Sequence, residues 1–172
     1  MDGSVRPRYA DCMNLDDPIV GRVLAFLERI GVPVAIEPLP EDGFLPGMTV
    51  RYGTLVIDPA RPAHPGDLLH EAGHIAVTDP AMRNAREATV DDPADEMAAI
   101  AWSYAAALEI GLDPAILFHE DGYRGEGRWL AETFGKGSYI GLPMLHYYGM
   151  AIDAKIATDG GPAYPKMRRW LR

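Results

Sequence analysis

The stretch DLLHEAGHIAV, residues 67 to 77, contains two histidines four positions apart with a glutamate between them. A helix turns about 100° per residue, so residues i and i+4 lie on the same face, one turn apart. His70 and His74 can therefore direct both imidazoles to one point, and Glu71 projects beside that face. The apolar residues around them favour a helix that is largely buried. The stretch thus predicts a helix that presents two nitrogen ligands and a neighbouring carboxylate.

This residue set matches the needs of a catalytic zinc ion. Zinc takes nitrogen ligands at roughly 2.0–2.1 Å in tetrahedral geometry, and a catalytic site has three protein ligands and one open position. A general base must reach the water without ligating the metal, as Glu71 can. The alternative is an amphipathic helix whose histidines bind nothing. An HExxH pattern arises by chance in about one chain in a hundred of this composition, which favours the zinc hypothesis.

The third ligand has to come from elsewhere in the chain. A histidine six residues after His74 would mark the metzincin pattern, but that position is Pro80. Glu96 is the favoured candidate, because it opens an alanine-rich helical pattern that can run back beside the first helix. Asp79 and Asp95 have alternative explanations as a helix cap and a first-turn acid. The further candidates that stay open are Glu109, His119 and His146.

The remaining patterns predict an α+β fold. Asp-Pro pairs precede several helical patterns, because aspartate accepts the amide hydrogens of the first turn and proline fits the first helical position. The expected helices lie at 19–31, 94–111, 115–120, 127–135 and 142–157, and the expected strands lie within 32–38 and 48–58, the latter a hairpin around Gly53. We expect a small, mostly antiparallel sheet packed on the HExxH helix and a second long helix.

Length and composition predict one domain covering residues 1–172. About 15 N-terminal residues and the C-terminal tail are expected to be mobile ends. The single cysteine, Cys12, excludes an internal disulfide framework, and no nucleophilic role is expected for it because it lies in the N-terminal segment expected to be mobile. No signal peptide or membrane-spanning run is recognisable, so a cytoplasmic protein without membrane partners is expected.

The charge distribution argues against nucleic acid as a partner. The net charge is −9 and the pI is near 4.9, whereas binding to phosphates needs a positive field. The exception is the tail KMRRWLR, residues 166 to 172, with four basic residues in seven. It is either a solvated turn or a docking surface for an acidic partner.

The segment His70-Glu71-Ala72-Gly73-His74, with a glutamate opening the next helix, resembles the gluzincin type of zinc metallopeptidase. The length is most similar to that of the minigluzincins and the ImmA/IrrE-like peptidases, and the resemblance covers residues 50 to 110. It implies a minigluzincin-like zincin fold, in which the HExxH helix follows a small sheet. It also implies Zn²⁺ as cofactor, with His70, His74 and Glu96 as ligands and Glu71 as general base.

The expected activity is that of a metallo-endopeptidase that cleaves peptide or protein substrates with a zinc-activated water. A further donor should stabilise the oxyanion. The sequence offers four candidates for it, Tyr104, His146, Tyr147 and Tyr148. Two other functions stay open: a catalytically silent zincin-fold protein that binds or regulates a partner, and a metal-dependent hydrolase of a non-peptide amide.

Overall fold

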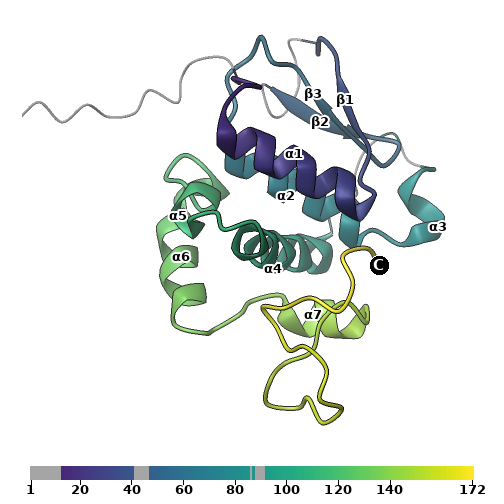
Figure 1. Cartoon of the computed structure of the whole chain (residues 1–172), viewed down its shortest axis with the longest axis vertical. Coiled ribbons are helices and arrows are strands. Elements are labelled where there is room, and N and C mark those ends of the chain that lie inside the picture. The colour runs from purple at the N-terminus through teal and green to yellow at the C-terminus, as the bar shows by residue number, and fades with distance from the viewer. Residues whose placement is uncertain (1–12, 41–46, 86, 88–91) are drawn as a thin grey trace, which may run out of the picture.

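A computed structural model describes residues 13–40, 47–85, 87 and 92–172 of the chain, so Cys12 and the N-terminal end lie outside it. In chain order its elements are α1 (Pro18–Ile30), β1 (Val34–Ile36), β2 (Met48–Arg51), β3 (Thr54–Ile57), α2 (Pro65–Val77), α3 (Pro80–Arg83), α4 (Pro93–Glu109), α5 (Pro114–Leu117), the 3-10 turn η1 (Tyr123–Gly125), α6 (Gly127–Gly135) and α7 (Leu142–Tyr147). The α+β class is confirmed (Figure 1). None of the helices in these ranges is both long and apolar enough to cross a bilayer.

The Asp-Pro pairs start helices as predicted. In four helices the aspartate before the proline accepts a hydrogen bond from the backbone N–H two residues later, with the proline in the first turn. These caps are Asp17 on α1, Asp79 on α3, Asp92 on α4 and Asp113 on α5. Asp79 therefore has the capping role that the sequence suggested.

The sheet has three strands in the order β1-β3-β2. The predicted hairpin is present: β2 and β3 are antiparallel, and they are joined by Tyr52 and Gly53, both with positive φ, as a tight two-residue turn requires. The sheet is mixed rather than mostly antiparallel, because β1 pairs with β3 in parallel. The chain places β1 on the edge opposite β2, so β3 is central and its residues 55–57 are buried.

The helices form layers beneath the sheet (Figure 1). α1 contacts β1, while α2 contacts β2 and β3. α4 lies against the other side of α2, and α7 lies against α4. α4 is buried along ten successive residues, 98 to 107, which is the pattern of a helix surrounded by protein on all sides.

α2 and α4 approach each other closely at Gly73. A methyl group on Gly73 would lie 2.9 Å from the backbone oxygen of Ala99 and 3.0 Å from Oγ of Ser103. The Ser103 hydroxyl is within hydrogen-bonding distance of two backbone carbonyls, that of Ala99 at 2.6 Å and that of Leu69 at 3.2 Å. The glycine in the HEAGH motif therefore sets how near the two helices can come.

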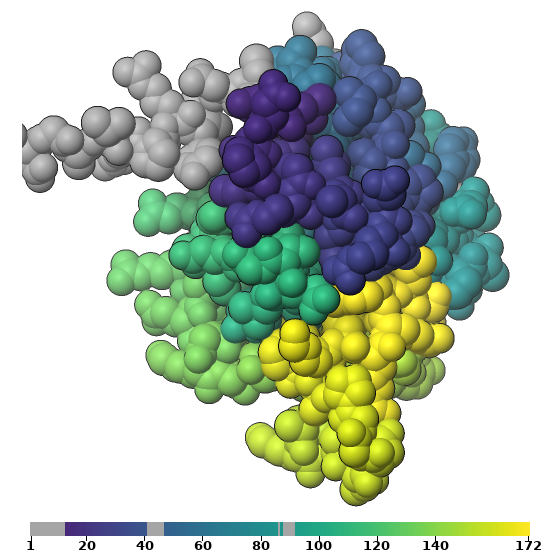
Figure 2. Space-filling model, viewed as in Figure 1, coloured from purple at the N-terminus to yellow at the C-terminus, as the bar shows by residue number. Residues whose placement is uncertain are grey.

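The C-terminal segment packs against the middle of α4. The Tyr164 hydroxyl donates to the carbonyl of Ala101, and the indole N–H of Trp102 donates to that of Trp170. The Trp170 ring packs edge-on against Phe26 of α1 at a centroid distance of 4.9 Å. The segment consequently adjoins α1 on the surface in Figure 2.

The basic tail is packed against the protein rather than extended into solvent. Arg172 donates its backbone N–H to Ala76 and lies over the ring of Tyr148 at 3.8 Å. The guanidinium of Arg169 donates to the carbonyl of Tyr148. Lys166 and Arg168 form ion pairs with acidic residues of this chain, Glu109 and Asp159. All four basic side chains of the tail therefore have partners within the chain.

One helix is shorter than the sequence suggested. The pattern at 142–157 predicts one helix, but α7 ends at Tyr147 and the chain turns at Gly149, whose φ is +68°. A side chain rarely adopts that conformation, so the glycine terminates the helix. The apolar residues that follow, Met150 and Ala151, are buried in non-helical backbone.

Replacing Gly73 by alanine tests the packing of α2 on α4. We expect Gly73→Ala to destabilise the fold, because overpacking a tight contact costs about 1–3 kcal/mol. Gly21→Ala is the matched control, since a methyl group at this position of α1 meets nothing within 4 Å. The control should gain up to about 1 kcal/mol of helix propensity. Urea unfolding measures both, and equal stabilities of the two variants would refute the close contact.

Candidate metal centre

α2 carries the two histidines of the HEAGH motif on one face. The Nε2 atoms of His70 and His74 lie 3.2 Å apart, as expected for imidazoles one helical turn apart. Both side chains are largely buried, with 16% and 13% of their surface exposed. Glu71 lies beside the pair, with a carboxylate oxygen within 4.8 Å of a ring nitrogen of each histidine.

Glu96 in the first turn of α4 completes a trio. Its Oε1 lies 3.5 Å from Nε2 of His70, and its Oε2 lies 3.2 Å from Nε2 of His74. The Glu96 side chain is 42% exposed, so the trio is open to solvent on the α4 side. The structure therefore brings together the three residues that the sequence proposed as ligands.

The spacing of the trio fits a zinc ion. The edge of a tetrahedron is about 1.6 times the distance from its centre to a corner, so ligands at roughly 2.0–2.1 Å from zinc stand roughly 3.3–3.4 Å apart. The two imidazole nitrogens lie 3.2 Å apart, and each lies near a different oxygen of Glu96, His70 at 3.5 Å from Oε1 and His74 at 3.2 Å from Oε2. Two imidazole nitrogens and a glutamate carboxylate are also a donor set that zinc uses in hydrolases.

The charge states of two members suit a ligand role. Burial, assisted by the positive charge of a protonated His74, lowers the pKa of His70 to about 4, so its imidazole is neutral at pH 7. The hydrogen bond with His74 lowers the pKa of Glu96, so its carboxylate is ionised. Neutral imidazole and ionised carboxylate are the forms that bind a metal.

His74 and Glu71 are shifted in the opposite sense. Burial acts to lower the pKa of His74, but its hydrogen bond with Glu96 and the charge of Glu71 outweigh it and raise that pKa. Metal binding at His74 therefore competes with a proton. Burial raises the pKa of Glu71, and the negative charges of Asp67 and Glu96 add to this effect. A carboxylate with a raised pKa is a stronger base, as proton abstraction requires.

The first turn of α4 is held by residues around α7. The Tyr148 hydroxyl donates to the carboxylate of Asp95 at 2.5 Å. Gly141, with a φ of +87°, packs so closely that a methyl group on it would lie 1.9 Å from the backbone oxygen of Met97. These two contacts flank Glu96 in the sequence and fix the turn that carries it.

The other candidate ligands have different surroundings. Asp95 pairs with Tyr148, and Glu109, at the far end of α4, pairs with Arg29 and Lys166. His119 lies 2.8 Å from Asp67 through its Nε2 atom. Asp79 is the N-cap of α3, and His146 is exposed on α7.

The four residues proposed as oxyanion donors lie in different surroundings. Tyr104 lies in an aromatic cluster with Phe118 and Phe134, 4.9 Å from the latter ring. Tyr148 donates its hydroxyl hydrogen to Asp95, as described above. His146 and Tyr147 are exposed on α7, Tyr147 to 78%.

Tyr123, which the sequence did not single out, lies against the trio instead. Its ring meets that of His70 edge-on at 5.1 Å, and its hydroxyl oxygen is buried with no hydrogen-bond partner in the described part of the chain. Burial raises its pKa well above the usual value, and the negative charges of Asp67 and Glu96 raise it further, so the hydroxyl stays protonated.

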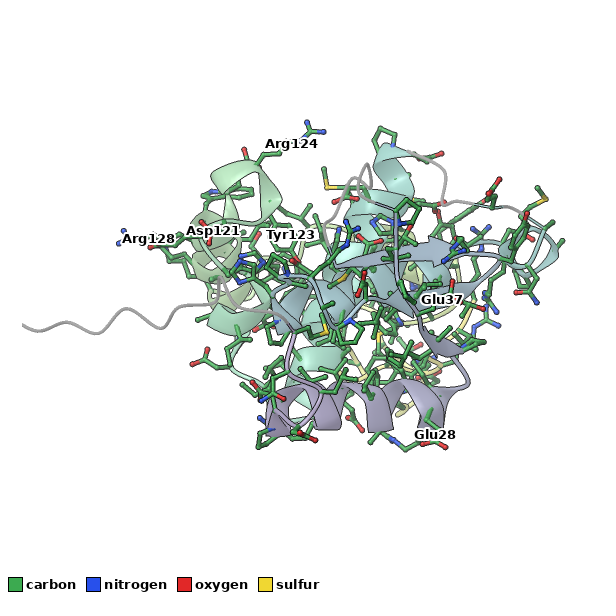
Figure 3. The ribbon with its side chains drawn as sticks, turned by 90° about the horizontal axis from the view of Figure 1, so that it is seen from above. Glu28, Glu37, Asp121, Tyr123, Arg124 and Arg128 are labelled. Atoms are coloured by element: carbon green, nitrogen blue, oxygen red, sulfur yellow. The ribbon has the colours of Figure 1, made fainter. Side chains whose placement is uncertain are left out.

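The backbone around Tyr123 is strained. Tyr123 and Arg124 have φ values of +53° and +56°, a conformation that costs about 1–3 kcal/mol per residue outside glycine. Such residues cluster at functional sites. In Figure 3, Asp121 and Tyr123 lie along the loop beside α6, and Arg124 reaches out from the ribbon. The sequence signal was weak: a tyrosine in the glycine-rich stretch DGYRGEG.

Comparison with protein-family models, curated proteins and solved structures finds no match to this chain.

Removing the carboxylate of Glu96 tests its role as a ligand. Loss of an outer-shell residue typically costs 10–100-fold in metal affinity, and loss of a ligand should cost at least the upper end of about 100-fold. We expect Glu96→Ala to lose affinity for one equivalent of Zn²⁺ to this extent, measured by calorimetric titration of chelator-treated protein. Glu109→Ala, at the opposite end of the same helix, should bind as the wild type does. Identical binding by both variants would exclude Glu96 as a ligand.

Proposed function

We propose that this chain is a zinc-dependent peptidase with a minigluzincin-like zincin fold. The main support is the spacing of His70, His74 and Glu96, whose nitrogen and oxygen atoms stand 3.2 to 3.5 Å apart. The order of elements agrees with this fold, because a small sheet precedes the HEAGH helix and the next long helix carries the glutamate. The half-buried carboxylate of Glu71 beside the trio favours hydrolysis over simple binding, since a binding protein needs no general base there.

In the proposed mechanism, the protein residues hold the substrate carbonyl and a water close to the trio. Zinc, when bound, supplies Lewis-acid chemistry, which lowers the pKa of water and polarises a carbonyl group. Glu71 accepts the proton of the attacking water, for which its raised pKa suits it. The same carboxyl group then gives the proton to the leaving amine. One residue thus serves first as base and then as acid.

Tyr123 is proposed as the donor to the oxyanion. Its hydroxyl hydrogen is available, because no protein group in the described residues accepts it. The ring packs on His70, so the hydroxyl is carried by a residue in contact with the trio. The high pKa keeps it in the donating form at any pH near neutrality. A preoriented donor of this kind stabilises charge that develops during attack.

Glu71→Gln should strongly reduce turnover and retain zinc. General acid–base catalysis contributes about 10²–10⁴-fold, so the rate of cleavage of a fluorogenic peptide mixture should fall by that factor. Zinc content by elemental analysis should be unchanged, because Glu71 is not proposed as a ligand. Glu28→Gln, an exposed position on α1, is the control and should keep full activity (Figure 3). Wild-type rates in the Glu71 variant would refute the mechanism.

Tyr123→Phe separates catalysis from stability. We expect kcat to fall by about 10²–10³-fold with little change in KM, as for other oxyanion donors. The melting temperature should stay constant or rise, because the substitution removes a buried hydroxyl that has no partner. Tyr147→Phe, exposed on α7, should change neither quantity. An unchanged kcat in the Tyr123 variant would contradict its role as a donor.

A further inference from the structure

Arg172 of the basic tail connects the end of α2 with the start of α4. Its backbone N–H donates to the carbonyl of Ala76 at 2.9 Å, and its guanidinium donates to that of Val77 at 3.3 Å. The same guanidinium lies 3.8 Å from the centre of the Tyr148 ring. The hydroxyl of that tyrosine donates to Asp95 of α4 at 2.5 Å. The contacts of one residue therefore extend to both helices that carry the trio.

The last turn of α2 takes hydrogen-bond donors from outside the helix. The final four carbonyl groups of a helix have no partner within it. The hydroxyl of Thr78 donates to the carbonyl of His74 at 2.6 Å. Arg83 donates to that of Ile75, and Arg172 donates to those of the next two residues. Arg83 also donates to the carbonyl of Arg172 at 3.0 Å, so the backbone of the tail is bound on both sides here.

Glu96 depends on the backbone of its turn for its position. Its side chain is 42% exposed, and the ion pairs that it forms join it to His70 and His74. Little packing therefore holds this side chain itself. The preceding residue, Asp95, is fixed by the hydroxyl of Tyr148. Because Tyr148 is only 8% exposed, its hydrogen bond to Asp95 is shielded from water.

Two arginines of the basic tail hold Tyr148. Arg172 lies over one face of its ring, where a guanidinium is attracted to the electrons of the ring. Arg169 donates to its backbone carbonyl. Lys166 of the same tail has a different position, since it pairs with Glu109 at the far end of α4. The contacts toward the trio thus belong to particular residues of the tail.

We infer that the docked tail positions the metal ligands, through Arg172 at the end of α2 and through Tyr148 and Asp95 at the start of α4. Ligand distances in metal sites stay within about 0.2 Å of their ideal values, so a small shift between the two helices weakens binding. Docking of the tail and binding of the metal are then coupled, and each favours the other to the same extent. This role rests on the metal centre of the proposed function, and it gives the tail a task within its own chain.

The zinc affinity of chelator-treated protein, measured by calorimetric titration, tests this role. Tyr148→Phe removes the hydroxyl but keeps the ring, and Arg172→Ala removes the guanidinium but keeps the backbone hydrogen bond. Each should bind Zn²⁺ about tenfold more weakly than the wild type, which is the lower end of the range for lost outer-shell partners. Lys166→Ala, in the same tail, is the control and should bind as the wild type does. Far-UV circular dichroism checks that all three variants are folded.

A conservative variant separates the hydrogen bond from the rest of the contact. Asparagine at position 95 still offers a side-chain oxygen to the Tyr148 hydroxyl, whereas alanine does not. Both substitutions remove the same charge. Asp95→Asn should therefore bind zinc more tightly than Asp95→Ala, and equal affinities of the two would overturn the role of the hydrogen bond.

A further measurement uses the unmodified chain. Because the coupling is reciprocal, saturating zinc should slow hydrogen exchange of the Arg172 amide by about tenfold. The amide of Lys155, which donates to Asp153 in an exposed turn, is the internal control. It should exchange at the same rate with and without zinc.

The possible results separate the role of the tail from the metal centre itself. Wild-type protein that binds no zinc overturns both. Zinc binding that is weakened in Glu96→Ala but unchanged in Tyr148→Phe and Arg172→Ala supports the metal centre and overturns the role of the tail. An Arg172 amide whose exchange does not respond to bound zinc overturns that role as well. Weaker binding in both tail variants, with an unchanged control, supports it.

Discussion

The candidate site depends on the contact between two helix backbones at Gly73. Because this residue has no side chain, the backbone of Ala99 lies directly against α2, and the hydroxyl of Ser103 bridges to the carbonyl of the neighbouring turn. Glu96 is three residues before Ala99, so it lies one turn nearer the start of α4 on the same face. The first turn of α4 therefore faces His70 and His74 of α2. A bulkier residue in the middle of the motif would separate α2 from α4, and the distances of 3.2 to 3.5 Å in the trio would increase with that separation.

The site also shows how one environment can give neighbouring groups opposite protonation preferences. Burial favours the neutral form of His70 and of Glu71, whereas the mutual hydrogen bond favours the charged forms of His74 and Glu96. The protonation preferences differ because of geometry: His74 and Glu96 are close enough to form a charge-assisted hydrogen bond, which favours the charged form of each. The neutral imidazole and the ionised carboxylate suit binding, and the more basic carboxyl suits proton transfer. Residues of the same chemical type thus receive different roles from their positions.

Much of this arrangement was predictable from periodicity and from a few special residues. The four-residue spacing of the histidines predicted their common face, and the alanines of the next helical pattern indicated that Glu96 could come near. Tyr123 was not predictable, because its place depends on two residues with positive φ and on the packing of distant elements. The parallel pairing of β1 and the burial of the C-terminal segment likewise arise from contacts between residues far apart in sequence. Local patterns do not encode such contacts.

The carbonyl end of α2 has a consequence for the order in which the protein forms. Arg172 donates its backbone N–H to Ala76, and Arg83 donates side-chain N–H groups to Ile75 and to the carbonyl of Arg172. A ribosome produces the HEAGH helix about a hundred residues, or several seconds, before the residue at position 172. The helix therefore leaves the exit tunnel without one of the partners for its last turn. The hydrogen bonds of its last turn are therefore completed only after position 172 has been translated.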